Sequence, residues 1–277
     1  MIPQKIHYCW LSGERFPAAI QAYMESWRRV MPDYELCCWD ASRFDIRTIP
    51  FVEEACRARK WAFAADYIRL HALYAEGGIY LDVDVIAHQR LDRFLDNRFF
   101  SAVEYHRQYV RDHGVLALLH PDGTPKTPHS HIPGICLQAA ILGAERGHPF
   151  LRDCMDWYRD KHFRLADGRF FTHLLAPDIY AQVATGYGFK YADVEQLLQA
   201  GMRIYPSAVF APTPEEHNPN ACAVHCCRGS WREPGIVRVK PTGFAKLKRS
   251  IQKRLRGFPL ASAQRKTQLT VWPADEM

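Results

Sequence analysis

In the first hundred residues, short apolar runs alternate with longer segments that repeat apolar residues at helical spacing. Three runs predict strands, and two segments predict helices (strands at 5–10, 34–39 and 77–86; helices at 17–30 and 51–75). The run at 34–39 carries few polar residues, as expected where both faces of a sheet are covered. The alternation of strand and helix predicts an α/β fold with a mixed sheet flanked by helices.

The later part of the chain shows a weaker version of the same pattern. We expect three more strands and two more helices (strands at 98–104, 202–205 and 223–225; helices at 147–160 and 177–185). Prolines and histidines gather between His106 and Pro133, which favours a loop or lid in that segment.

The run GGIYLDVDVI at residues 77–86 holds two carboxylates within an otherwise apolar strand. If it is extended, its side chains alternate, so four apolar residues share one face and Tyr80, Asp82 and Asp84 share the other (the apolar set is Ile79, Leu81, Val83 and Val85). Two carboxylates this close repel unless a cation lies beside them. Oxygen ligands favour a hard divalent ion such as Mg²⁺ or Mn²⁺. The alternative is a strand end with two solvated aspartates.

Asp66 and Arg69 lie three residues apart on the helix before this strand, so they share one helical face. An ion pair within the helix is the simpler interpretation. Beside a metal–diphosphate site, the same pair is suited to binding sugar and ribose hydroxyls.

The sequences ADYIRL (65–70) and GGIYLDVD (77–84) together resemble the DXD-containing sugar-binding region of glycosyltransferase family 32. That family includes bacterial capsule and lipopolysaccharide sugar transferases and Golgi mannosyltransferases, and the large glucosylating toxins share its signature. Three further segments resemble the family: IHYCW at 6–10, GAERGHPF at 143–150 and HCCRGSW at 225–231. The resemblance spans about residues 2 to 232.

This resemblance implies a GT-A fold and a nucleotide-sugar donor. By position, Trp10 would lie against the donor's base, and Tyr80 would lie near the base or ribose. Asp66 and Arg69 would contact the transferred sugar. The resemblance further implies that Asp82 binds ribose and reaches the metal through water. Asp84 and His225 would ligate the metal directly, and Ser230 and Trp231 would donate hydrogen bonds to the leaving phosphate.

Elementary chemistry agrees with these roles. Breaking a glycosyl–phosphate bond leaves negative charge on a diphosphate, which a divalent cation offsets. The serine hydroxyl and indole N–H of Ser230 and Trp231 add fixed hydrogen bonds where that charge develops. Imidazole suits Mn²⁺ better than Mg²⁺, so His225 favours manganese. Cys226 and Cys227 sit inside this motif without an assigned role.

Charge divides the chain into two parts. Residues 236–277 contain ten lysines and arginines against two acidic residues, a charge of +8, which leaves the preceding residues near −2. Apolar residues recur there at helical spacing, which predicts a basic amphipathic helix (Phe244, Leu247, Ile251, Leu255 and Phe258). We expect a glycosyltransferase domain at 1–235 and a tail at 236–277. The tail either binds an anionic membrane surface or docks on the domain.

Composition favours a cytoplasmic protein. The nine cysteines include no CxxC spacing, which indicates neither a disulfide framework nor a zinc site. No run of about eighteen apolar residues occurs, and no signal peptide opens the chain. The basic tail carries no nucleic-acid-binding motif, so we expect no nucleic-acid partner.

Together these observations predict a metal-dependent, retaining glycosyltransferase. It is expected to move a hexose from a UDP-linked donor to a glycan or lipid-linked acceptor in bacterial surface polysaccharide synthesis, on the inner face of the plasma membrane. One rival is a sugar-nucleotide pyrophosphorylase, which needs a glycine-rich basic loop after the first strand, whereas residues 11–14 are short and acidic. The other rival is a non-catalytic membrane- or glycan-binding module.

Overall fold

The computed structural model describes residues 1–128, 130–214 and 218–227. The predicted domain boundary at residue 235, the basic tail, Ser230 and Trp231 therefore lie outside the described residues.

The described part is an α/β fold built on a mixed sheet, as predicted. Its helices are α1 Ala18–Val30, α2 Pro50–Arg57, α3 Trp61–Glu76, α4 Arg107–Asp112, α5 Pro149–Tyr158 and α6 Ala176–Thr185. Its strands are β1 Lys5–Cys9, β2 Glu35–Trp39, β3 Gly78–Leu81, β4 Val85–Ala87, β5 Phe99–Tyr105, β6 Ile135–Leu137, β7 Ile141–Ala144, β8 Gln196–Leu197, β9 Met202–Tyr205, β10 Phe210–Ala211 and β11 Ala223–His225.

The main sheet has the strand order β2-β1-β3-β7-β5-β9-β8, with β6 pairing β5. Strands β2, β1 and β3 run parallel, whereas β7 is antiparallel to both β3 and β5. A smaller sheet has the order β10-β11-β4. Because β1, β2 and β3 are parallel, their carboxyl ends meet at one edge, where open α/β sheets bind ligands.

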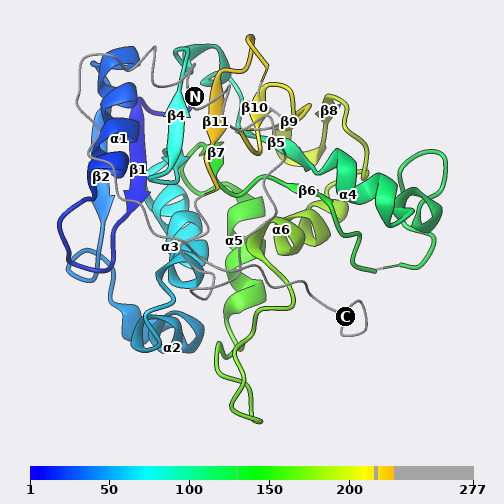
Figure 1. Cartoon of the computed structure of the whole chain (residues 1–277), viewed down its shortest axis with the longest axis horizontal. Helices are drawn as coiled ribbons and strands as arrows, with labels where there is room; N and C mark the ends of the chain where they lie inside the picture. Colours follow the sequence, from blue (N-terminus) through cyan, green and yellow to red (C-terminus); the bar gives the residue numbers. More distant parts are fainter. Residues whose placement is uncertain (129, 215–217, 228–277) are drawn as a thin grey trace, which may run out of the picture. The chain divides into compact units, whose positions relative to one another are not determined.

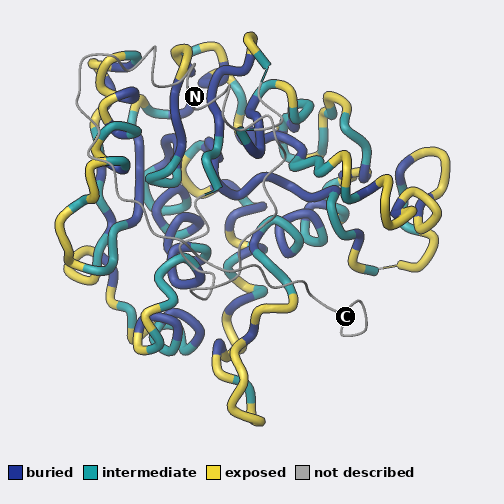
Figure 2. Tube along the Cα trace, in the orientation of Figure 1, coloured by how far each residue is buried: buried dark blue, intermediate teal, exposed yellow. Residues whose placement is uncertain are grey.

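The two faces of the main sheet have different partners (Figure 1). On one face, α1 and the small sheet close a core that contains Ile79 and Leu81 of β3. On the other face, α3 packs on β1 and β3, and the guanidinium of Arg69 lies over the ring of Tyr80. Figure 2 shows buried strands between these layers, while the segment around α4 is largely exposed.

The end of α3 follows the sequence prediction. Gly77 caps the helix with a φ of +69°, and its N–H donates to Leu73 O at 2.8 Å. Gly78 follows with a φ of +119°, and a Cβ there would lie 2.9 Å from Nε2 of His7. The glycine pair thus turns the chain and allows β3 to approach β1 closely.

Two sequence predictions about helices and loops need correction, and one strand was missed. The single helix predicted at 51–75 is wrong: α2 and α3 are separate, because Arg59 takes a left-handed φ of +57°. The loop predicted at 106–133 contains α4 and a 3₁₀ turn at Val115–Leu118. The central strand β7 was not predicted, because its short apolar run carries no alternation.

Candidate metal and donor site

The DXD sequence forms a turn between two strands that belong to different sheets. The prediction of one continuous strand across residues 77–86 is wrong, because β3 ends at Leu81 and β4 begins at Val85. The amide of Val85 donates to Asp82 O at 2.9 Å, which closes a β-turn with Asp82 at its first position, where aspartate is favoured. Val83 and Val85 still pack on the apolar core, as the alternation predicted.

The register of the small sheet brings His225 to this turn. Strand β11 is antiparallel to β4, and His225 pairs with Val85, the residue after Asp84. The amide of Cys226 extends the ladder by donating to Asp84 O at 2.9 Å. Strand β4 is fixed from the other side by α1, since Trp27 Nε1 donates to Val85 O and Ala87 N donates to Ser26 Oγ. An imidazole far along the sequence is therefore held beside the two aspartates.

Asp82, Asp84 and His225 offer a donor set that fits a divalent cation. One ligand atom from each residue lies within 4.8 Å of the other two. Nε2 of His225 lies 3.3 Å from Oδ1 of Asp84 and 3.9 Å from Oδ2 of Asp82. Neighbouring ligand atoms around an octahedral Mg²⁺ or Mn²⁺ are about 3–4 Å apart, given bond lengths of about 2.1 Å. Carboxylate oxygen and imidazole nitrogen are donors that Mn²⁺ accepts.

A second cluster of possible ligands, His7, Cys37 and Glu76, is engaged in structural contacts. Trp39 Nε1 donates to His7 Nδ1, and His7 Nε2–H donates to Gly77 O. Glu76 accepts hydrogen bonds from Lys5 and Arg43. Because both imidazole nitrogens and the carboxylate have partners, this cluster holds β1 to α3 instead of offering a metal site.

The site is electrostatically suited to positive charge. Burial lowers the pKa of His225, but Cys227 and the Asp84 carboxylate raise it by more, so it lies well above its ordinary value. The arrangement that favours a proton on this ring also favours a divalent cation at the same place.

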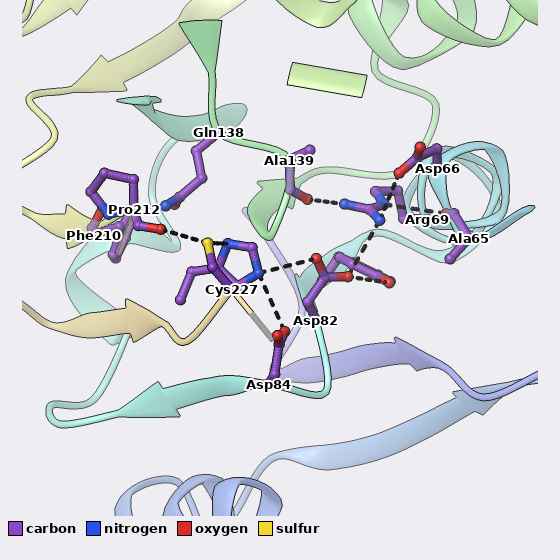
Figure 3. A network of polar contacts seen from close by, with 12 residues as sticks. Ala65, Asp66, Arg69, Asp82, Asp84, Gln138, Ala139, Phe210, Pro212 and Cys227 are labelled. Carbon is purple, nitrogen blue, oxygen red and sulfur yellow. Dashed lines mark hydrogen bonds and ion pairs between the residues drawn. The ribbon is translucent and has the colours of Figure 1, made fainter. Parts of the chain in front are cut away.

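Arg69 links the DXD turn to helix α3 (Figure 3). Its Nη2 lies 2.9 Å from Oδ1 of Asp66 and 3.3 Å from Oδ1 of Asp82, and its side chain is 4% exposed. Its Nη1 donates to Ala139 O at 2.6 Å, and its Nε donates to Ala65 O at 3.2 Å. The ion pair predicted within the helix is present, and it extends to the first aspartate of the DXD.

Asp66 is a mostly buried carboxylate at the same edge. Its side chain is 14% exposed, and its backbone carbonyl accepts a hydrogen bond from Tyr180 of α6 at 2.6 Å. Burial raises the pKa of Asp66 to about 7, against the opposing effect of Arg69 and with a further contribution from Asp82. Asp66 thus offers a carboxyl that either accepts or donates a hydrogen bond near neutral pH.

Tyr80 lies beneath the turn. Its side chain is covered, with 1% of the residue exposed, and its hydroxyl donates to Oδ1 of Asp82 at 2.9 Å. Tyr80 therefore acts on the site by way of Asp82, whose Oδ1 is bound by both Tyr80 and Arg69. Burial also raises the pKa of the neighbouring Cys9 thiol to about 12, so this thiol stays protonated.

Trp10 follows the carboxyl end of β1, the strand that pairs in parallel with β3. Its ring packs on Phe16 with 4.5 Å between centroids, and its Nε1–H donates to Glu14 O at 2.7 Å. The indole is partly exposed on the sheet edge that carries the DXD turn.

Sequence reasoning missed three contributors to the site. The connection between β6 and β7 supplies the carbonyls of Ala139 and Ala140, which accept from Arg69 Nη1 and from the amide of Asp82. Backbone acceptors leave no mark in the sequence. Cys227, whose thiol contacts His225, was noted only as a residue without a role.

A known protein family matches the part of the chain that carries the DXD turn. Residues 17–100 match the family model described as a glycosyltransferase sugar-binding region containing a DXD motif. This segment includes Asp66, Arg69 and the DXD turn. Residues 17–100 thus form a glycosyltransferase sugar-binding region of the DXD type.

Two curated proteins are distantly similar to this chain. It is 22% identical to the initiation-specific alpha-1,6-mannosyltransferase of Candida albicans, over 86% of this chain and 74% of the relative. It is 32% identical to the uncharacterized glycosyltransferase L373 of Acanthamoeba polyphaga mimivirus, over 36% of this chain and 42% of that protein.

Solved structures show a looser likeness. A galactosyltransferase LgtC complex with donor and acceptor sugar analogs covers 92% of this chain and 97% of its own, at 14% identity and a TM-score of 0.41. Mouse xyloside xylosyltransferase 1 in its apo form covers 82% of this chain and 98% of its own, at 8% identity and a TM-score of 0.47.

Proposed function

We infer that this glycosyltransferase is a metal-dependent, retaining hexosyltransferase that uses a nucleoside diphosphate sugar. The observation that carries the proposal is the convergence of Asp82, Asp84 and His225 at the carboxyl edge of β3. We further propose UDP as the nucleotide and a glycan or lipid-linked glycan of bacterial surface polysaccharide as the acceptor, in line with the bacterial capsule and lipopolysaccharide enzymes that the motifs resemble.

Asp84 and His225 are the proposed direct ligands, because Nε2 of His225 lies 3.3 Å from Oδ1 of Asp84. Asp82 is already bound by Tyr80 and Arg69 through Oδ1, which leaves Oδ2 facing His225. We assign Asp82 to the ribose and to the metal's bound water. When bound, the cation supplies Lewis-acid stabilisation of the departing diphosphate.

Asp66 is the proposed contact to the transferred sugar. It is more exposed than Arg69, and the guanidinium holds its carboxyl at the edge of the site. Arg69 contributes positive charge beneath the site and keeps both aspartates oriented. Trp10 offers an aromatic face for the base, and Ser230 and Trp231 remain proposed donors to the leaving phosphate.

Retention of the anomeric configuration is assigned to front-face displacement, in which the departing diphosphate accepts the proton of the acceptor hydroxyl. Glu104 of β5 is a candidate acceptor-side carboxylate, and it accepts a hydrogen bond from His106 at 2.9 Å. We expect Glu104→Gln to keep near-normal turnover, and a collapse of turnover would assign Glu104 a role in the reaction.

A screen of nucleotide sugars for Mn²⁺-dependent hydrolysis tests this proposal. We expect turnover of a UDP-hexose by the wild-type protein and none by Asp84→Asn. Asp167→Asn is the matched control, since Asp167 is exposed and pairs with Arg169. GDP-mannose belongs in the screen because one relative is named a mannosyltransferase. Its exclusive use would overturn the choice of UDP, and activity without a divalent ion would overturn the metal assignment.

We also propose that the protein is cytoplasmic and that residues 236–277 bind an anionic membrane surface, where a lipid-linked acceptor would be found. None of the helices in the described part of the chain is long and apolar enough to cross a bilayer. Flotation with vesicles containing phosphatidylglycerol, with and without residues 240–277, tests the tail. Equal flotation of both forms would refute it.

A further inference from the structure

The imidazole of His225 is contacted on both of its nitrogens. Nε2 faces Asp82 and Asp84, whereas Nδ1 lies 3.3 Å from Sγ of Cys227. The same sulfur lies 3.1 Å from the carbonyl oxygen of Pro212 (Figure 3). The thiol therefore bridges the ring of His225 and the backbone that follows β10.

A histidine that binds a metal through Nε2 carries its proton on Nδ1. That N–H usually donates to a carboxylate or carbonyl, which fixes the tautomer and the ring orientation. A cysteine sulfur is a weak acceptor and its S–H a weak donor. Sγ of Cys227 has the geometry for both contacts, accepting from Nδ1–H while its own proton goes to Pro212 O.

We propose that Cys227 is a positioning residue that holds His225 in the tautomer and orientation in which Nε2 faces the metal site. This inference rests on the metal site of the proposed function. It gives a role to one of the two cysteines that interrupt the His-to-Ser-Trp motif.

The backbone conformation around Cys227 supports a specific position for its thiol. Cys227 has a φ of +42°, in the left-handed region that non-glycine residues rarely occupy. The preceding amide, that of Cys226, is fixed to Asp84 O. Because Sγ contacts the nitrogen opposite Nε2, Cys227 is placed behind the ring and not among the ligands of the same ion.

A double-mutant cycle on Mn²⁺ affinity tests the proposal without using turnover. We expect Cys227→Ala to weaken Mn²⁺ binding by about tenfold, the lower end of the range for residues that orient a ligand. Cys227→Ser, which keeps a donor and an acceptor, should recover most of that loss. In a His225→Gln background, Cys227→Ala should change the affinity less than twofold.

The control is Cys226→Ala, which keeps the amide that binds Asp84 O and should leave the affinity unchanged. An equal loss from Cys227→Ala with and without His225 would overturn the proposal, because the effect would not pass through the imidazole. Unchanged affinity in Cys227→Ala would overturn it while leaving the metal site standing. Absence of Mn²⁺ binding by the wild-type protein would overturn both.

Nitrogen-15 NMR of histidine-labelled, metal-free protein gives a second readout that needs no variant at Cys227. The His225 Nδ1–H, identified by its loss in His225→Gln, should give an exchange-protected signal. A rapidly exchanging Nδ1 proton in the wild-type protein would contradict the hydrogen bond to sulfur.

Discussion

Nη2 of Arg69 lies 3.3 Å from Oδ1 of Asp82, so an arginine of α3 shares its charge with the first aspartate of the DXD turn. The same nitrogen also binds Asp66, and the guanidinium is almost fully buried. The carboxylates of Asp66 and Asp82 are both stabilised by the guanidinium of Arg69, because an unpaired buried charge carries a large desolvation penalty.

Arg69→Met should therefore destabilise the protein and abolish donor turnover. Leaving buried carboxylates without their partner costs about 3–5 kcal/mol in the free energy of unfolding. Arg69→Lys keeps the charge but not the planar set of donors, so a smaller loss is expected. Chemical denaturation measures the change. Arg47→Met, on an exposed pair with Asp45, is the control and should cost less than about 1 kcal/mol.

The two DXD aspartates should differ in what their substitution removes. Asp84→Asn takes away a proposed ligand, whereas Asp82→Asn removes a residue that is held by Tyr80 and Arg69. We expect Asp82→Asn to weaken Mn²⁺ binding by about 10–100-fold and Asp84→Asn to remove it. Calorimetric titration with MnCl₂ gives both values. A larger effect from Asp82→Asn would reverse the assignment of direct ligand and supporting residue.

Gly78→Ala tests the close approach of β3 to β1. The new Cβ would lie 2.9 Å from His7 Nε2 and 3.0 Å from Lys5 O, at a φ of +119°. Strain and overpacking together should cost about 2–5 kcal/mol. Gly168→Ala is matched in backbone, with a φ of +85° and nothing within 4 Å. It should cost about 1 kcal/mol. Equal melting temperatures for the two variants would contradict the packing argument.

The free energy of unfolding should decrease as the pH is lowered, because His7 is buried. Burial lowers the pKa of His7, although its hydrogen bond to Gly77 O opposes this. The neutral ring is therefore favoured in the folded state, and its contribution is fully present above the unfolded pKa of about 6.5. As pH falls below that value the unfolded chain takes up the proton first, so the free energy of unfolding decreases by at most about 1.4 kcal/mol per pH unit.

His7→Gln keeps a donor and an acceptor but does not titrate, so its unfolding free energy should depend less on pH between 5 and 6.5. Denaturant titrations at several pH values measure the slope. His148→Gln should show a change in the same direction, since burial likewise lowers the pKa of His148. An unchanged slope in His7→Gln would refute the titration of His7.

The sequence predicted the α/β class and the strand and helix on either side of the Gly77–Gly78 turn. It predicted these because apolar periodicity and glycine caps are local signals. It did not predict the break at Asp82–Asp84, because the apolar residues on both sides of the turn continue the strand-like alternation. Nor did it predict that β4 leaves the main sheet, which is decided by the pairing with β11 about 140 residues later.

The candidate site shows the same division. Spacing indicated that Asp66 and Arg69 share one face and that Asp82 and Asp84 share another, and the resemblance to the family joined the two pairs in one site. His225 was found through the motif that contains it. Its position opposite Val85 is set by the pairing of β11 with β4, which the sequence does not reveal. The carbonyls of Ala139 and Ala140 could not be predicted, since any residue supplies such an acceptor and only the fold places it.

The most direct test of the central claim is a titration of the full-length protein with Mn²⁺ in the presence of UDP, followed by water-proton relaxation. The account predicts one Mn²⁺ per chain in the wild-type protein, no binding in Asp84→Asn, and unchanged binding in the control Asp167→Asn. Binding that survives in both Asp84→Asn and His225→Gln would show that the ion is held elsewhere and would contradict the account.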